Sequence, residues 1–143
     1  MAGLSGPAIF PVALDAVVLA CAGLDRLRLG ARIDERIATE CMLPAVCQGM
    51  LALEARAGEA LGRELAALDG PGNAVAVAAE RSFLQHLEGD CTIPLAGFCE
   101  HLPDGRLRLR GLVARRDGRG AARGGSEGPA ATAEQVGRRV AAE

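Results

Sequence analysis

The residue with the widest chemical scope in this chain is Cys91, a thiol within the segment 87–94. That segment follows an apolar helical pattern, and Gly89 predicts a tight, exposed turn around the sulfur. A thiolate on such a turn is a nucleophile that can anchor a group covalently. Glu88 and Asp90 disfavour a thiolate by their negative charge. The residue pattern alone therefore favours the other common role of cysteine, a small and partly buried hydrophobe.

The composition excludes several kinds of site. All 16 basic residues are arginine, which rules out a Schiff-base lysine and a P-loop lysine in this sequence. The five cysteines and two histidines form no zinc-binding spacing, so we expect no metal site. With a net charge of −2 and only three aromatic residues, the chain is expected to bind neither nucleic acid nor a membrane.

The cysteines also indicate a compartment. An odd number of cysteines without a secretory signal is typical of reduced thiols in the cytoplasm. The apolar stretch 8–24 does not fit a signal peptide, because no positive charge precedes it and Pro11 and Asp15 interrupt it. We therefore expect a cytoplasmic protein.

The N-terminal half predicts strands and helices of an α/β domain. The apolar run 17–20 fits a strand buried on both faces, and Gly23 begins a turn into a short helix. The run 50–53 fits a second buried strand, and a helix with leucines at 61, 65 and 68 follows it. The turn 69–72 stops this helix and is the best domain boundary.

After that turn the pattern becomes α+β. Asn73 is expected to cap a helix with one apolar stripe, which consists of Ala76, Val77, Ala79, Phe83, Leu84 and Leu87, and Gly89 is placed to end it. Strands at 95–101 and 107–113 are expected to form a hairpin. The second strand buries its leucines and exposes an arginine face made of Arg106, Arg108 and Arg110.

The C-terminal segment combines a glycine-rich stretch with a last helix. Residues 115–129 are so rich in glycine and arginine that their composition predicts a loop. Thr132 and Gln135 fit a capping box that opens a final helix, with Val136 and Val140 on its inner side.

Several motifs occur along the chain in a familiar order. They are A-E-R-S-F-L at 79–84 with its preceding alanine, L-E-G-D-C-T-I-P at 87–94, the L-D-A run at 14–27, L-P-A-V-C-Q-G at 43–49, and the segments 51–56 and 107–113. Together they resemble the motifs of hydroxymethylbilane synthase, also called porphobilinogen deaminase. In that family the matching signatures are A-E-R-x-F-L, L-E-G-G-C-x-V-P, L-D-A-x-V-L-A-x-A-G-L-x-R-L and L-P-A-V-G-Q-G. The resemblance covers residues 14–143.

The resemblance implies a three-domain architecture of which this chain holds the C-terminal part. Residues 1–47 match the end of α/β domain two, and 48–70 match the hinge and crossover toward domain one. Residues 71–143 match the C-terminal cofactor-cysteine domain, an α+β domain with a three-stranded antiparallel sheet packed on helices. Its third strand is expected near 121–125, within the stretch whose composition alone predicts a loop.

The resemblance also implies a site. In the family, the cysteine that matches Cys91 carries the dipyrromethane cofactor through a thioether. Arg26 matches an arginine that binds cofactor or substrate carboxylates, whereas on its own it fits a solvated helix charge. Gln48 and Gly49 match the hinge and cleft edge, and Gly89 matches the cofactor turn. Glu80 and Arg81 match a pair at domain contacts, with either a structural or a cofactor role.

The implied function is that of a transferase which polymerises porphobilinogen into linear hydroxymethylbilane during porphyrin and haem biosynthesis. Its partners are porphobilinogen, the growing polypyrrole and the N-terminal half, and the family is usually monomeric. The catalytic aspartate of the family lies in domain one, so no catalytic residue is assigned and the isolated chain is expected to be inactive. Cys47, Asp90 and Thr92 depart from the family pattern. Cys47 and Asp90 favour an alternative, a non-catalytic remnant that serves as a small binding or scaffold domain.

Overall fold

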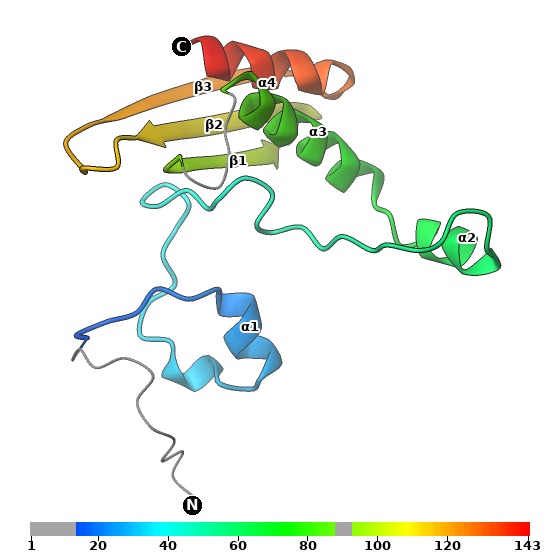
Figure 1. Ribbon diagram of the computed structural model, residues 1–143, viewed down its shortest axis with the longest axis horizontal. Helices are drawn as coiled ribbons and strands as arrows, with labels where there is room; N and C mark the ends of the chain where they lie inside the picture. The colour runs from blue at the N-terminus through cyan, green and yellow to red at the C-terminus, as the bar shows by residue number, and fades with distance from the viewer. Residues whose placement is uncertain (1–13, 88–92) are drawn as a thin grey trace, which may run out of the picture. The chain divides into compact units, whose positions relative to one another are not determined.

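The computed structural model describes residues 14–87 and 93–143. The chain divides into two compact units between Ile37 and Ala38. In Figure 1 the described part of the first unit runs from blue to cyan, and the second unit continues from cyan to red. Cys91 and Gly89 lie outside the described residues.

The first unit contains one short helix and one helical turn. Helix α1 spans Cys21–Arg26, and the 3₁₀ turn η1 spans Gly30–Arg32. The prediction of a buried strand at 17–20 is wrong, because this segment has no strand and Val17, Val18 and Leu19 are 60–64% exposed. A strand needs a neighbour to receive its backbone hydrogen bonds, and within the described residues the three strands pair only with one another.

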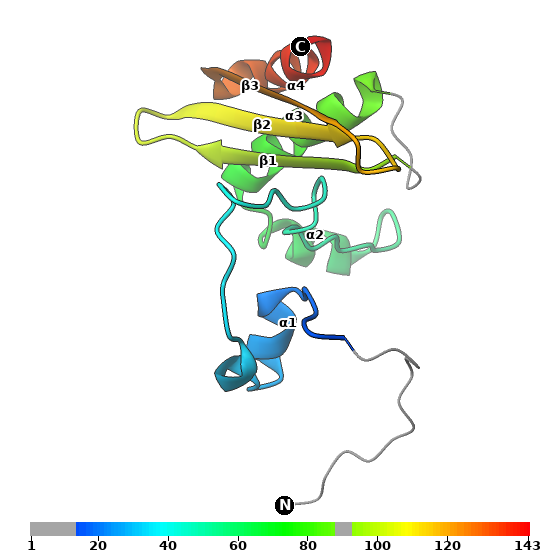
Figure 2. The same ribbon diagram turned by 90° about the vertical axis from the view of Figure 1, so that its left-hand side faces the viewer.

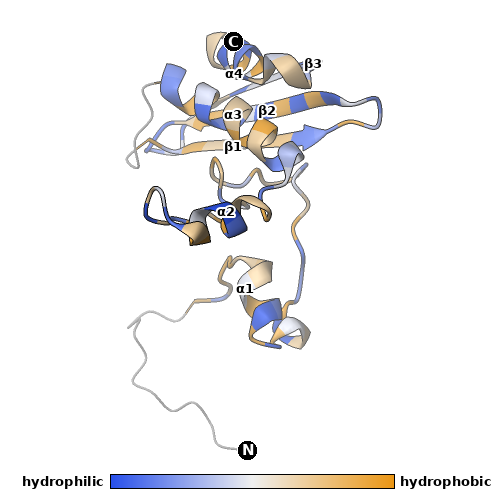
Figure 3. Ribbon diagram, turned by 90° about the vertical axis from the view of Figure 1, so that its right-hand side faces the viewer, coloured by the Kyte–Doolittle hydropathy of each residue, from blue (hydrophilic) through white to orange (hydrophobic). Residues whose placement is uncertain are grey.

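The second unit is built on an antiparallel sheet. Its strands are β1 (Leu95–His101), β2 (Arg106–Ala114) and β3 (Ala121–Pro129), in the order β1-β2-β3 (Figures 1 and 2). The predicted hairpin is confirmed, and β2 alternates between hydrophobic and hydrophilic residues (Figure 3). Leu107 and Leu109 are fully buried, whereas Arg106 and Arg108 are exposed.

The third strand is also confirmed, and it is longer than expected because it continues to Pro129. Composition alone is misleading here, since the glycines of β3 meet a closely packed helix. A Cβ atom added at Gly128 would lie 2.9 Å from Val136 Cγ2 and 2.8 Å from the Arg139 guanidinium. The small residues that suggest a loop therefore permit a helix to lie against the strand.

Two helices form a layer on one face of the sheet. Helix α3 spans Pro71–His86 and α4 spans Ala133–Ala142, preceded by the 3₁₀ turn η2 (Ala130–Thr132) (Figures 1 and 2). The core between these layers consists of Ala76, Ala79, Phe83, Cys99, Leu107, Leu109, Ala133, Val136 and Val140. The predicted apolar stripe of α3 and the inward valines of α4 are thus largely confirmed, with Val77, Leu84 and Leu87 only half-buried.

The predicted cap of α3 is wrong, and at α4 Thr132 is the N-cap residue as predicted but lacks the side-chain bond of a capping box. Helix α3 begins at Pro71, with Gly70 and not Asn73 as its N-cap, because proline suits the first turn, where the backbone N–H has no intrahelical partner. At α4 the Thr132 side chain makes no cap bond, and its Oγ1 instead donates to the Pro129 carbonyl at 3.0 Å. At its other end α3 stops at His86, with Leu87 as the C-cap.

The part of the second unit that precedes helix α3 differs most from expectation. Residues 50–53 form no strand, and Leu51 and Leu53 are 84% and 61% exposed. The physical reason is again the lack of a pairing strand in the described part of the chain. The helix expected after it is present as α2 (Ala60–Ala66), but none of its residues is buried.

On both outer edges of the sheet, backbone N–H groups find partners outside the sheet. On β1, the Gly97 N–H donates to the Pro44 carbonyl at 3.0 Å and the Cys99 N–H donates to Glu80 Oε1 at 2.8 Å. On β3, the Gly125 N–H donates to Glu143 Oε2 at 2.9 Å. Such pairing removes the free backbone groups through which edge strands associate. None of the described helices is long and apolar enough to cross a membrane.

Candidate functional site

The thiol of Cys99 is shielded from solution chemistry. Cys99 lies in the middle of β1 opposite Leu109, and only 6% of its surface is exposed. Burial raises the pKa of this thiol to about 12, and the charges of Glu80 and Glu100 act in the same direction. At neutral pH the group is a protonated hydrophobe, which is what its place in a hairpin strand predicts.

Cys47 lies on a tight turn that is tied to helix α3. Its backbone has a φ of 59°, in the left-handed region that favours glycine. The Cys47 N–H donates to Glu80 Oε2 at 2.6 Å, and the Cys47 carbonyl accepts from the Met50 N–H at 3.0 Å. The family pattern has glycine here, and the structure shows that cysteine still forms the turn in a conformation that glycine adopts without strain.

The thiol of Cys47 is also a weak nucleophile. Partial burial raises its pKa first, the nearby Glu80 charge raises it further, and Arg81 opposes them. A thiol with a raised pKa has less thiolate at neutral pH and reacts more slowly. Two rivals of Cys91 as a covalent anchor, Cys47 and Cys99, are therefore both in unfavourable surroundings.

We predict that alkylation of the native chain with iodoacetamide at about pH 8 leaves Cys99 unmodified and modifies Cys47 more slowly than the exposed Cys41. The reason is the burial of the two thiols, which disappears on unfolding. Peptide mass spectrometry with and without urea provides the measurement. Equal rates for Cys99 and Cys41 in the native chain would contradict the described packing.

Replacing Cys47 by glycine should stabilise the turn. A left-handed conformation costs an L-residue roughly 1–2 kcal/mol, and glycine avoids this cost at some loss of unfolded-state entropy. We expect Cys47→Gly to be about 1 kcal/mol more stable than Cys47→Ala, which lacks the sulfur but keeps the Cβ atom. Urea unfolding of the two variants measures the difference, and a more stable alanine variant would refute the strain.

Gln48 and Gly49 lie together on the Cys47 turn. The Gln48 Oε1 accepts from the Ala45 N–H at 3.1 Å, so this side chain braces its own turn. A Cβ atom added at Gly49 would meet no atom within 4 Å. This chain's own packing therefore does not require glycine at position 49, and the space beside it is open.

Arg26 is exposed at the end of α1 in the first unit. The neighbouring carboxylate of Asp25 is already occupied, because both of its oxygens bind the Arg36 guanidinium at 2.7 and 3.0 Å. That pairing lowers the pKa of Asp25, chiefly through the hydrogen bonds from Arg36. Within the described residues, the guanidinium groups of Arg26 and Arg32 have no hydrogen bond or ion pair.

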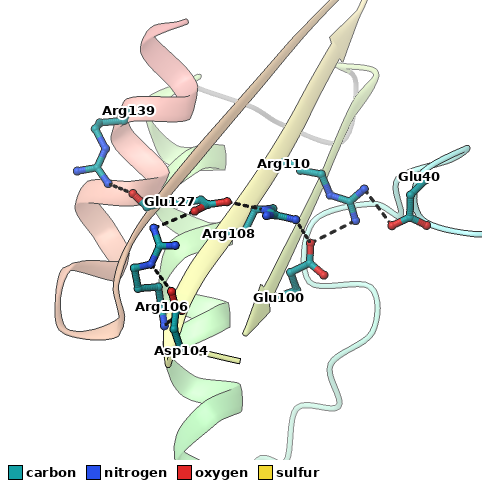
Figure 4. Close-up of polar contacts among 8 residues, drawn as sticks. All are labelled: Glu40, Glu100, Asp104, Arg106, Arg108, Arg110, Glu127 and Arg139. Atoms are coloured by element: carbon teal, nitrogen blue, oxygen red, sulfur yellow. Dashed lines mark hydrogen bonds and ion pairs between the residues drawn. The ribbon is translucent and has the colours of Figure 1, made fainter. Parts of the chain in front are cut away.

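The arginine face of the sheet is neutralised by its own carboxylates (Figure 4). Arg106 and Arg108 both bind Glu127, at 2.9 and 2.7 Å, and Arg110 lies 3.4 Å from Glu40. The hydrogen bond from Arg108 lowers the pKa of Glu127. The remaining contacts join these arginines to Asp104 and Glu100. This surface has the solvent-face character that the sequence predicts, and its positive charges are not free for an external polyanion.

Those predicted site residues that the structure describes thus fall into two places. Gln48 and Gly49 share one turn in the second unit, and Arg26 belongs to the first unit. Among the described residues no group of histidine, cysteine or acidic side chains is arranged to hold a metal ion.

Sequence reasoning underestimated Glu80. It is only 4% exposed, whereas the sequence assigns it either a structural or a cofactor role and does not predict its burial. A signal was present, because Ala76, Glu80 and Phe83 are spaced at i, i+4 and i+7 on one helix face. Arg32, whose free guanidinium resembles that of Arg26, was also not singled out.

Two family models match the chain. Residues 74–143 match the model described as porphobilinogen deaminase, C-terminal domain. Residues 8–64 match the model described as porphobilinogen deaminase, dipyromethane cofactor binding domain.

Curated relatives carry the same name. A porphobilinogen deaminase of Roseiflexus sp. (strain RS-1) is 44% identical over 80% of this chain and 39% of its own length. Those of Syntrophobacter fumaroxidans and Chromobacterium violaceum are 42% and 44% identical over 92% and 89% of this chain. They are matched over 42% and 41% of their own lengths. The chain spans about two fifths of the length of these relatives.

Proposed function

Because the chain belongs to the porphobilinogen deaminase family, of which it holds the C-terminal part, we propose that it contributes the cofactor cysteine of a hydroxymethylbilane synthase. The anchoring residue in this proposal is Cys91, and Gly89, two residues before it in the sequence, is proposed to assist it. The observation that carries the proposal is the pair of family models, which match 8–64 and 74–143 in order. The poor nucleophilicity of Cys47 and Cys99 supports it, because it removes two of the other thiols as attachment points.

The cofactor in this proposal is a dipyrromethane, joined to the sulfur of Cys91 by a thioether. When bound, it supplies the end to which porphobilinogen units are added, until a linear tetrapyrrole is released. The chain's own contribution begins with the thiol, which must lose its proton as the carbon–sulfur bond forms, while the carbon–nitrogen bond of the incoming porphobilinogen breaks and ammonia leaves with that proton. A cysteine outside the buried core meets this requirement better than Cys99, whose pKa of about 12 keeps it protonated.

Arginine is suited to the carboxylates of such a ligand. Guanidinium groups bind acetate and propionate groups in a bidentate fashion, and porphobilinogen carries both. The pairing of Asp25 with Arg36 leaves the Arg26 and Arg32 guanidiniums without a competing carboxylate in the described residues. We propose that Arg26 binds cofactor or substrate carboxylates, and that Arg32 can assist it.

The turn at Cys47 belongs to the second unit, and its proposed role is argued from that unit alone. The open space at Gly49 lets a flat pyrrole chain approach the backbone, and Gln48 holds the turn in shape. The departure from the family pattern at Cys47 does not favour a non-catalytic remnant, since the turn is formed with this residue.

A cytoplasmic location goes with this proposal, and the four described cysteines are all free thiols, as expected in a reducing compartment. The partners we propose are porphobilinogen, the growing polypyrrole and the N-terminal part that completes the relatives' length.

Turnover tests this function. The 143-residue chain alone is expected to make no hydroxymethylbilane from porphobilinogen, because no residue in it matches the family's catalytic aspartate. Addition of the N-terminal part of a relative, such as the porphobilinogen deaminase of Chromobacterium violaceum, should produce activity. Turnover by the chain alone would contradict the assignment of the roles. A well-folded complex of both parts without turnover would support a non-catalytic domain instead.

A further inference from the structure

The Glu80 side chain makes two buried hydrogen bonds to which the proposed function assigns no role. Its carboxylate is 4% exposed and lies in α3, and each oxygen accepts one backbone N–H. Oε2 accepts from Cys47 at 2.6 Å and Oε1 accepts from Cys99 at 2.8 Å. One buried side chain therefore ties together the Cys47 turn, the edge of β1 and helix α3.

The Cys47 turn has further contacts with the same body. The Pro44 carbonyl accepts from the Gly97 N–H at 3.0 Å, and Val46 and Met50 pack against the core formed by α3, α4 and the sheet. Thr39 Oγ1 accepts from the Arg110 guanidinium at 2.9 Å. Of these contacts, the bond from the Cys47 N–H to Glu80 Oε2 is the hydrogen bond that joins the turn to α3, the helix that precedes Cys91 in the sequence.

We propose that Glu80 is a positioning residue, whose buried carboxylate holds the Gln48–Gly49 turn on α3 and the edge of β1. This proposal rests on the proposed function, in which the turn and Cys91 belong to the same site. Glu80 itself touches no reacting atom. It acts through the backbone of Cys47, and the two residues that follow Cys47 take their position from it.

The energetic basis is the cost of leaving buried backbone donors without partners. Two N–H groups and a buried carboxylate satisfy one another here, so the loss of either bond favours movement of the turn away from α3. Glutamine at position 80 retains one carbonyl oxygen, and it turns an NH₂ group toward the second backbone N–H. Aspartate keeps both oxygens on a side chain one methylene shorter, which we expect to be unable to reach both amides.

The test is ¹⁵N relaxation of the 143-residue chain, in the parent and in Glu80→Gln, Glu80→Asp and Glu100→Gln. Glu100 is the matched control, a carboxylate on neighbouring β1 that pairs with Arg108 and Arg110 on the arginine face. The order parameters of the Gln48 and Gly49 amides are measured because neither amide binds Glu80. A change in these values therefore reports motion of the turn. Amides of Leu107 and Leu109 show whether the core remains folded.

We expect order parameters at Gln48 and Gly49 to fall from about 0.85 toward 0.6 in both Glu80 variants and to stay unchanged in Glu100→Gln, with the Leu107 and Leu109 values retained in all. Unchanged order at the turn in folded Glu80→Gln and Glu80→Asp would overturn the inference. So would an equal loss of order at Leu107 and Leu109, which marks a general structural role. Failure of the parent to accept a cofactor at Cys91 would contradict the proposed function. The order parameters would still test separately whether Glu80 holds the turn.

Discussion

The Gly137→Ala variant of this chain should lose most of the stability of its second unit. Gly137 lies in α4 where that helix crosses α3, and it is fully buried. A Cβ atom there would lie 2.3 Å from the Ala79 carbonyl oxygen and 2.8 Å from the Phe83 nitrogen. Both are backbone atoms, so no side chain can rotate away and the two helices must separate. We expect a loss of about 3 kcal/mol or more, at the upper end of overpacking effects.

The matched control for this prediction is Gly62→Ala. Gly62 also lies within a helix, α2, and a Cβ atom added there would meet nothing within 4 Å. Alanine is favoured over glycine in a helix by up to about 1 kcal/mol, so this variant should be neutral or slightly more stable. Urea unfolding followed by far-ultraviolet circular dichroism compares the two. Equal midpoints for both variants would show that α3 and α4 are not in close contact at this point.

The hairpin and the helix layer could be predicted from the sequence because the spacing of the apolar residues shows which side chains are buried. Leucine at 107 and 109 alternates with arginine at 106 and 108, and only one face of a strand can then enter the core. Phe83 and Ala79 likewise share a helix face. Such local periodicity is sufficient when both partners of the packing, here the helices and the sheet, occur in the same chain.

Local periodicity could not predict that the strands expected at 17–20 and 50–53 are absent. An apolar run indicates that a segment will be buried if a partner is available, but it does not supply that partner. Leu51, at 84% exposure, shows the result when no strand lies beside the run in the described chain. The burial of Glu80 could not be predicted for a related reason. Its carboxylate is buried against the backbone amides of Cys47 and Cys99, which are distant in sequence.

Of the predicted site, Gln48 and Gly49 lie on one turn and Arg26 is exposed, and the roles of all three remain proposals. The role of Cys91 rests on the family motif and on the unfavourable surroundings of its rivals. It therefore requires a chemical test that names the modified sulfur.

Substitution of Cys91 by serine should abolish covalent attachment of the cofactor. The chain is combined with the N-terminal part of a relative and supplied with porphobilinogen, from which the dipyrromethane forms. Serine keeps the size of the side chain but replaces the thiol with a hydroxyl group that is far harder to deprotonate. We expect the adduct in the parent and in Cys47→Gly, and complete loss in Cys91→Ser. Ehrlich staining of the denatured protein detects the bound pyrroles.

The decisive measurement is the position of the added mass along the peptide. Trypsin produces one peptide, 82–106, that contains both Cys91 and Cys99, so fragment ions must distinguish the two sulfurs. We expect the full added mass on Cys91 and none on Cys99, because burial of the Cys99 thiol raises its pKa to about 12. Added mass on Cys47 or Cys99, or a folded complex that carries no adduct at all, would contradict the assignment of Cys91 as the cofactor anchor.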